Sequence, residues 1–178
     1  WNTPEASHGF RNFEIASGAC PGEHWGPPFH DGDLYKWLEG VAAVYAVNKD
    51  SELDKLMDHV ISYIVKSQRE DGYIHTPVII EEKNKGIDTH SNAHKNTVIG
   101  TKVGAEDEKG AFANRLNFET YNLGHLMMAG ITHYRATGKK TLFDAAVKAT
   151  DFLCHFYETA SAELARNAIC PSHYMGVV

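Results

Sequence analysis

The sequence has few cysteines, and the three that it has, Cys20, Cys154 and Cys170, form no close pair. An odd and widely spaced set does not make a disulfide framework. We therefore expect free or partly buried thiols, and the cysteines do not reveal the cellular compartment.

Positive charge and long apolar runs are also scarce. The chain carries 17 Lys and Arg against 23 Asp and Glu, which gives a formal net charge of −6. Proteins that bind nucleic acids usually present a basic face, so we expect no nucleic-acid partner. No apolar run approaches the roughly 18–20 residues that cross a bilayer, so we expect no membrane partner either.

What the sequence does have is the composition of a globular protein. Of its 178 residues, 43% are hydrophobic and 22% are charged, which is ordinary for a folded domain. This length fits one domain or part of a larger one. Because the chain starts at Trp1 without Met and stops soon after a new segment opens, we expect a fragment of a larger domain.

Two segments in the first 70 residues show the apolar periodicity of amphipathic helices. The first spans 33–47, and Asp33 is its expected N-cap. The second spans 51–68, and Ser51-x-x-Asp54 has the pattern of a capping box.

Three other stretches lack this periodicity. Residues 1–29 are rich in Gly and Pro, and we expect a loop or arm there. Its packing would come from four aromatic side chains, Trp1, Phe10, Phe13 and Trp25. Residues 73–80 are expected to be extended, because Gly72 ends the preceding helix. Residues 81–114 are polar and irregular, and a loop of this length tends to be functional or mobile.

A second pair of helices follows. The first of them spans about 118–137 and ends at Gly138, a residue suited to the left-handed conformation that stops a helix. The next spans about 141–157 and starts with the pattern of another capping box, Thr141-x-x-Asp144.

The second pair of helices repeats the first at a spacing of 89 residues, so that, for example, Leu34 falls on Leu123. Repeated helical hairpins stack as antiparallel pairs, into an open solenoid or a closed toroid. The hairpins expected from this repeat lie at 33–68 and 117–158, with the start of a third at 171–178.

Polar clusters mark the start of every second helix of the repeat, in "HDGD", "FETYNLGH" and "CPSHYMG". Alternate helices of stacked hairpins point the same way, so these clusters are expected to meet at one face. Helix N-termini carry a partial positive charge that suits sugar hydroxyls or a developing negative charge. Lys36 and His125 hold equivalent repeat positions, although Lys36 can also pair with Glu39 on its own helix. For Asp33, simple helix capping remains an equal alternative.

Four segments together resemble a known family: "GPPFHDGDLYKWLEG", "QREDGYIHT", "LNFETYNLGHLMMAGITHYRATGKK" and "CPSHYMG". Their order and spacing are similar to those of the β-L-arabinofuranosidases of glycoside hydrolase family 127 and their close relatives. The resemblance covers most of residues 10–178, except for 81–114, which looks like an insertion. It implies an all-α fold, the (α/α)6 toroid of helical hairpins, which is present here only in part.

The resemblance also implies a retaining exo-glycosidase that removes terminal β-L-arabinofuranose, or a related sugar, from plant-derived glycans. In this family a zinc-bound cysteine is the nucleophile and a glutamate is the acid/base. The Glu-x-Cys and Cys-Cys patterns that hold the zinc are absent from this sequence. Zinc is therefore expected for the full-length enzyme, whereas this chain is expected to bind no metal and to be inactive alone.

The part of the site that the resemblance does place in this chain is the sugar-binding layer. His125 of "YNLGH" and His173 of "PSHYMG" match the sugar-binding histidines of the family. A neutral imidazole can donate one hydrogen bond and accept another. Further candidates are Tyr121, one helical turn before His125, Asp31, and Trp25, whose ring could face the sugar.

Two other functions stay open. A non-catalytic helical-repeat module would bind a partner on its concave face. An inverting (α/α)6 glycosidase would pair Asp31 with Glu119 around the scissile bond, although Glu119 also suits the first turn of a helix. His90 and His94 have the spacing of a helical metal pair, but their segment is expected to be a solvated loop.

The expected partner is a carbohydrate substrate. An unclosed toroid leaves helix faces uncovered, so we also expect association with the remainder of its own barrel or with a second copy. We expect a periplasmic or secreted location rather than a cytoplasmic one.

Overall fold

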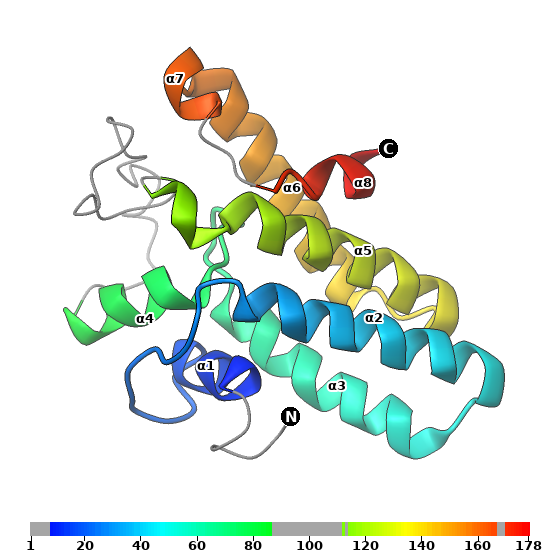
Figure 1. Cartoon of the computed structure of the whole chain (residues 1–178). Helices are drawn as coiled ribbons and strands as arrows, with labels where there is room; N and C mark the ends of the chain where they lie inside the picture. The colour runs from blue at the N-terminus through cyan, green and yellow to red at the C-terminus, as the bar shows by residue number, and fades with distance from the viewer. Residues whose placement is uncertain (1–7, 87–111, 113, 167–169) are drawn as a thin grey trace.

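The computed structural model describes residues 8–86, 112, 114–166 and 170–178, and every regular element within these ranges is helical (Figure 1). The all-α class expected from the sequence is confirmed. In chain order the helices are α1 (Gly9–Ala16), α2 (His30–Asn48), α3 (Ser51–Ser67), α4 (Thr76–Asn84), the 3-10 turn η2 (Arg115–Asn117), α5 (Glu119–Thr137), α6 (Thr141–Thr159), α7 (Ala162–Ala165) and α8 (His173–Val177). Within the described ranges, none of these helices is both long and apolar enough to span a membrane.

The two long hairpins stack in register as the repeat predicts. Helices α2 and α5 lie side by side and run in the same direction, with α3 and α6 behind them as a second layer (Figure 1). Helix α8 packs against α5 on the side away from α2. The front layer therefore consists of the first helix of each long hairpin, α2 and α5, followed by α8, which is the arrangement of a toroid of hairpins.

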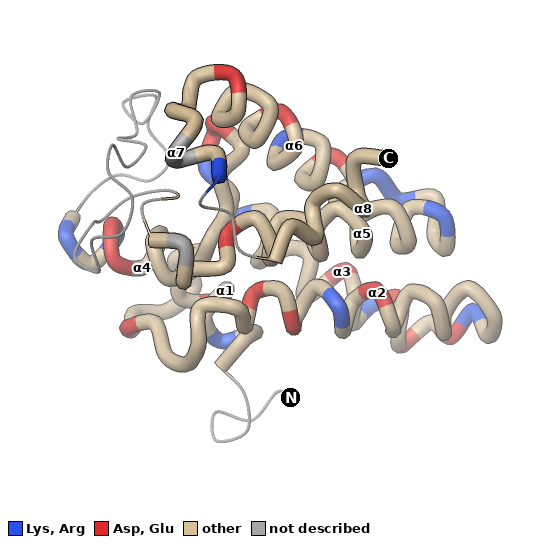
Figure 2. Tube along the Cα trace, turned by 45° about the horizontal axis from the view of Figure 1, so that its top comes forward, with Lys and Arg blue, Asp and Glu red and all other residues tan. Residues whose placement is uncertain are grey.

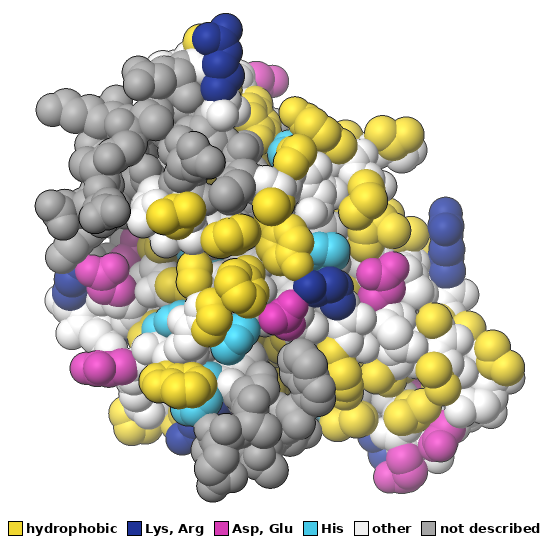
Figure 3. All heavy atoms as spheres, viewed as in Figure 1, with side chains coloured by type: hydrophobic (Ala, Val, Ile, Leu, Met, Phe, Trp, Pro, Cys, Tyr) yellow, Lys and Arg dark blue, Asp and Glu magenta, His cyan; other side chains and the backbone are white. Residues whose placement is uncertain are grey.

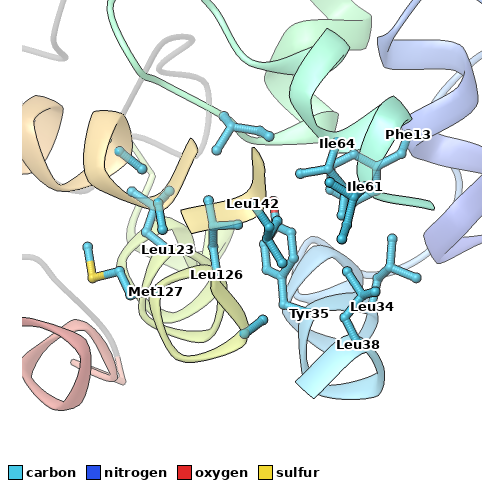
Figure 4. Packing of buried hydrophobic residues seen from close by; sticks show 14 of the residues in the cluster. Phe13, Leu34, Tyr35, Leu38, Ile61, Ile64, Leu123, Leu126, Met127 and Leu142 are labelled. Atoms are coloured by element: carbon cyan, nitrogen blue, oxygen red, sulfur yellow. The ribbon is translucent and has the colours of Figure 1, made fainter. Parts of the chain in front are cut away.

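The core fills the space between these layers (Figure 4). Periodic apolar positions on each helix face inward, and complete burial of one such side chain stabilises the fold by roughly 1.5–3 kcal/mol. Fully buried members from five helices are Phe13, Tyr35, Leu38, Met57, Ile64, Leu126 and Leu142. The hairpins are thus held together by one continuous apolar cluster.

The N-terminal segment differs from the expected arm. Helix α1 forms within it and buries Phe13 completely, whereas Phe10 is only partly buried and Trp25 is 58% exposed. Most of the Gly and Pro residues that suggested a loop lie in the stretch between α1 and α2: Gly18, Pro21, Gly22, Gly26, Pro27 and Pro28. Trp1 lies outside the described residues.

The expected N-terminal helix caps were wrong in each case. Helix α2 begins at His30, so Asp33 lies inside its first turn. At α3 the cap is Asp50, whose carboxylate accepts from the Glu52 amide at 2.8 Å. Helix α6 has no side-chain cap among the described residues, and Thr141 is its first residue. Capping patterns fix a helix start only to within a few residues, because neighbouring polar residues can take the same role.

Of the stretch expected to be extended at 73–80, residues 76–80 are instead the start of α4, whereas 73–75 precede the helix and His75 has an extended backbone. Pro77 lies in the first turn of α4, where the missing amide costs no hydrogen bond. The cap comes from another helix, since the Asp31 carboxylate accepts from the Thr76 amide at 2.7 Å. Helix α4 continues through 81–84 of the expected loop, and most of the remainder of that loop, including His90 and His94, lies outside the described residues.

The end of α5 agrees with the expectation. Gly138 has a φ of 77°, and its amide donates to the Tyr134 carbonyl at 2.8 Å. Lys and Arg residues gather where α5 turns into α6 (Figure 2). One of them, Lys139, reaches Asp54 and Asp58 of α3 at 2.7 Å each.

Candidate functional site

The starts of α2 and α5 are joined by Asn122. Its side-chain oxygen accepts from the Gly32 amide at 2.9 Å, and its side-chain nitrogen donates to the Pro28 carbonyl at 2.8 Å. A Cβ on Gly32 would lie 2.7 Å from that Asn122 oxygen, so the close approach requires glycine. The sequence analysis missed Asn122, although an Asn inside a helix is a signal that its side chain bonds elsewhere.

Asp31 lies at the base of this junction and is 1% exposed. Its two oxygens accept from the Thr76 amide at 2.7 Å and from the Thr76 hydroxyl at 2.6 Å, while His75 Nδ1 lies 3.5 Å away. These bonds fix α4 to the start of α2. Asp31 therefore has a structural anchoring role in this arrangement, in addition to lying close to the other candidates.

Glu119 is also buried, and its carboxylate accepts hydrogen bonds from other protein groups. The Phe112 amide donates to both of its oxygens, at 2.9 and 2.8 Å, and the Tyr73 hydroxyl donates at 2.5 Å. Burial raises the pKa of Glu119, although His75 and these two donors act in the opposite direction. The carboxylate thus anchors Phe112, whose ring stacks on Phe156 at 4.2 Å. It does not simply cap its own helix.

A polar row links α2 and α5 beside this junction. The Lys36 ammonium contacts Asp33 at 2.7 Å and donates to the Tyr121 hydroxyl at 2.6 Å. The alternative pairing of Lys36 with Glu39 was therefore wrong. The Tyr121 ring in turn meets the His125 ring edge to face at 4.5 Å. Basic, acidic and histidine side chains lie side by side over these helices in Figure 3.

His125 is the half-buried end of this row. Burial is the main cause that lowers its pKa, and the Lys36 charge adds to the effect while Asp33 opposes it. The imidazole is therefore held neutral at neutral pH, a form that offers both a donor and an acceptor. Its repeat partner Lys36 is its spatial neighbour, as the spacing of 89 residues suggested.

The third polar segment joins the same region through its backbone. A Cβ on Gly124 would lie 2.3 Å from the His173 amide nitrogen, so α8 packs directly on α5 next to His125. The His173 side chain turns toward Tyr157, with Nε2 3.4 Å from the hydroxyl and the rings stacked. Burial lowers its pKa, and its Nδ1 is buried without a partner among the described residues.

Three further histidines, His24, His30 and His75, gather at the start of α2. Each has one ring nitrogen that is buried and unpartnered within the described ranges. Burial lowers the pKa of His24 to about 4, opposed by Asp31 and supported by His75 and His30. Buried groups without partners usually mark a place for water or a ligand. The sequence analysis singled out His30 only as part of the "HDGD" cluster and gave no role to His24 or His75, because nothing in the local sequence shows that the three meet.

Trp25 lies beside this histidine group. Its ring packs on that of His8 at a centroid distance of 4.1 Å, and more than half of its surface is exposed. Asn12 holds its backbone through two hydrogen bonds. The exposed ring is thus fixed in place at the edge of the polar region, where it can meet a ligand.

The residues present do not fit the zinc site that the family resemblance implies. The described ranges contain no group of three or more His, Cys, Asp or Glu that could hold a metal ion. All three cysteines lie in these ranges as free thiols, Cys154 and Cys170 exposed and Cys20 partly buried. Thiolates gathered around one point are the ligands that such a site requires, and these three thiols do not supply them.

Comparison with known proteins decides the family. The profile described as the β-L-arabinofuranosidase GH127 catalytic domain matches residues 1–178. This chain belongs to glycoside hydrolase family 127. A solved GH127 β-L-arabinofuranosidase from Geobacillus stearothermophilus T6 is 34% identical, with a TM-score of 0.63, and the match covers 82% of this chain and 19% of that one. The toroid of helical hairpins expected from the sequence is therefore shown.

Two other relatives agree with this assignment. A non-reducing end β-L-arabinofuranosidase of Bifidobacterium longum is 29% identical over 154 residues, covering 83% of this GH127 chain and 19% of the relative. A solved glycoside hydrolase is 57% identical with a TM-score of 0.57, over 94% of this chain and 21% of that one. The chain thus spans about a fifth of the length of the relatives that it matches.

Proposed function

We propose that the protein carrying this chain is a retaining exo-glycosidase that releases terminal β-L-arabinofuranose or a related sugar from plant-derived glycans. The chain contributes part of the sugar-binding pocket. The observation that carries the proposal is the meeting of three polar segments at the front layer of the toroid, where Lys36, His125 and the His173 backbone lie together. The names of the relatives supply the substrate class.

Within this pocket His125 is the main sugar-binding residue. Its neutral imidazole accepts a hydrogen bond from one sugar hydroxyl and donates to another. Tyr121 and the exposed Trp25 ring are supporting contacts, since aromatic faces pack against the apolar face of a sugar ring. His173 and Asp31 support the pocket through α8 and α4. In this proposal the nucleophile, the acid/base and any zinc are held by residues outside this chain.

The alternative catalytic pair Asp31 and Glu119 finds no support in the geometry. Both carboxylates are almost fully buried. Both also accept hydrogen bonds from protein donors on each oxygen. A catalytic pair needs oxygens that face the scissile bond and a water molecule. For the binding-module alternative, the wild-type assay below is the deciding measurement.

The test is turnover of an aryl β-L-arabinofuranoside by the whole protein. Wild type should release L-arabinose with retained configuration, which NMR of the first-formed anomer reads directly. His125→Ala should lower kcat/KM by roughly 10–100-fold, because hydrogen bonds to the sugar are lost. His155→Ala, on the exposed face of α6, is the matched control. Activity of His125→Ala within a few-fold of wild type would exclude the proposed role.

A further inference from the structure

The hydrogen bond between Lys36 and Tyr121 leaves the hydroxyl proton of Tyr121 free to be donated to another group. An ammonium can only donate, so in this 2.6 Å contact the Tyr121 hydroxyl is the acceptor. Its own O–H must then donate elsewhere, and within the described ranges no side chain or carbonyl accepts it. The hydroxyl is thus a donor without a protein partner in the described part of the chain, in a half-buried position.

Asp33 supplies the complementary acceptor. One of its oxygens contacts Lys36 at 2.7 Å, and the other has no donor among the described residues. Lys36 therefore lies between an available donor, the Tyr121 hydroxyl, and an available acceptor, the second Asp33 oxygen. Its charge also polarises the hydroxyl and makes it a stronger donor.

Packing fixes the geometry of this row. The Tyr121 ring rests on Gly32, where a Cβ would lie 2.9 Å from the ring carbon Cε1, and it lies roughly perpendicular to the His125 ring. The Lys36 ammonium lies 5.1 Å from the centre of the same ring. The donor is therefore held on a rigid aromatic support that touches the candidate sugar-binding histidine.

We propose that Asp33, Lys36 and Tyr121 form a subsite for a neutral vicinal diol, adjoining His125. Tyr121 donates to one hydroxyl of the sugar, Asp33 accepts from its neighbour, and Lys36 is a positioning residue that orients both. This inference rests on the proposed function and names the chemistry of one wall of its pocket. The ion pair leaves no net charge, so a neutral sugar fits better than a uronate, which would meet the Asp33 carboxylate.

A surface ion pair without function would look similar in sequence. Lys55 and Glu52 on α3 have the same i, i+3 spacing and a contact of 2.8 Å, but both are well exposed and no described tyrosine bonds to them. Such a pair contributes about 0–1 kcal/mol to stability and nothing to binding. Lys55→Met is therefore the matched control for Lys36→Met.

The experiment measures kcat/KM of the whole protein on an aryl β-L-arabinofuranoside and on its 2-deoxy and 3-deoxy analogues. Wild type should lose about tenfold when the hydroxyl that Tyr121 contacts is absent. Tyr121→Phe should show the same loss on the parent substrate and no further loss on that analogue. Lys36→Met should show the same loss of kcat/KM on the parent substrate and no further loss on that analogue. The double variant should have a kcat/KM no lower than that of either single variant.

The outcomes separate the two proposals. Wild type that turns over no terminal arabinofuranoside would reject the proposed function and this subsite with it. Active wild type, with Tyr121→Phe and Lys36→Met as active as Lys55→Met, would overturn the subsite alone. The subsite would also be overturned if Tyr121→Phe lost as much kcat/KM on the deoxy analogue, relative to the parent substrate, as wild type does. Urea unfolding of each variant shows whether the fold is kept. A variant that is less stable but keeps the wild-type loss on the deoxy analogues also counts against the subsite.

Discussion

Helices α2 and α5 meet at both of their ends, and the two ends are built differently. At the end where they begin, the polar end (Asp31–Lys36 and Glu119–His125), buried side chains accept from backbone amides: Asn122 joins α5 to α2, Asp31 joins α2 to α4, and Glu119 holds Phe112. At the end where they finish, the turn end (Lys49 and 136–139), lysines form the contacts near the surface.

The difference separates two ways of joining the same helices. Near the surface a lysine can exchange its partner for water at little cost, so the turn end contributes stability without fixing atoms tightly. Buried donors and acceptors at the polar end have no such alternative, and each lost partner leaves a costly unpaired group. A ligand site needs the second kind of construction, because its groups must be held in one geometry.

The largest expected effect compares two aspartates that accept from helix-start amides. Asp31→Ala should destabilise the protein by about 3 kcal/mol, because the Thr76 amide and hydroxyl lose their buried acceptor. Asp50→Ala at the exposed start of α3 should cost only about 1 kcal/mol. Urea unfolding measures both. Equal costs would mean that the polar end is no more tightly constrained than the turn end.

A smaller effect is expected from glycine substitutions. Gly124→Ala places a Cβ 2.3 Å from the backbone of α8 and should cost about 2 kcal/mol. Hydrogen exchange should then show α8 detached from α5. Gly40→Ala, in α2, meets open space and should stabilise by about 0.5–1 kcal/mol instead. A harmless Gly124→Ala would show that α8 does not need this close approach.

The effect that is smallest at neutral pH concerns the titration of His24, because it develops only as the pH falls. His24 has a folded-state pKa of about 4, lowered mainly by burial, against an ordinary value of 6.5. Between these two values the unfolded chain binds a proton that the folded protein does not, so stability falls as pH drops from about 6.5 to about 4. His24→Asn should make the unfolding free energy less dependent on pH in this range, by a slope that corresponds to at most about one bound proton.

Urea midpoints at several pH values measure the difference between wild type and His24→Asn. His155→Asn, on the exposed face of α6, is the matched control and should keep the wild-type slope. A slope unchanged by His24→Asn would show that the histidines at the start of α2 are open to water.

The helical pairs were predictable because their signals are local and repeated. Apolar periodicity placed α3 and α6 within two residues of their observed ends, and Gly138 marked the end of α5. The spacing of 89 residues also placed Lys36 beside His125. Periodicity succeeds here because each long helix buries one face along its whole length.

Helix α4 was not predictable, because its cap lies 45 residues away in the sequence. The amide of Thr76 is satisfied by Asp31, and no local pattern in 73–80 reports that bond. The same holds for Asn122, Gly32 and the histidines at the start of α2. Their partners belong to other helices, so only the packed structure reveals them.

The sequence by itself determined the four long helices, how the hairpins repeat and which family the chain resembles, because these features depend on spacing along the chain. Tertiary structure decided what each polar residue does. Asp31 became an anchor, Lys36 turned to Tyr121 rather than Glu39, and the His173 ring turned toward Tyr157. Hydrogen-bond partners are chosen by distance in space once the helices have packed, and the sequence spacing does not encode that distance.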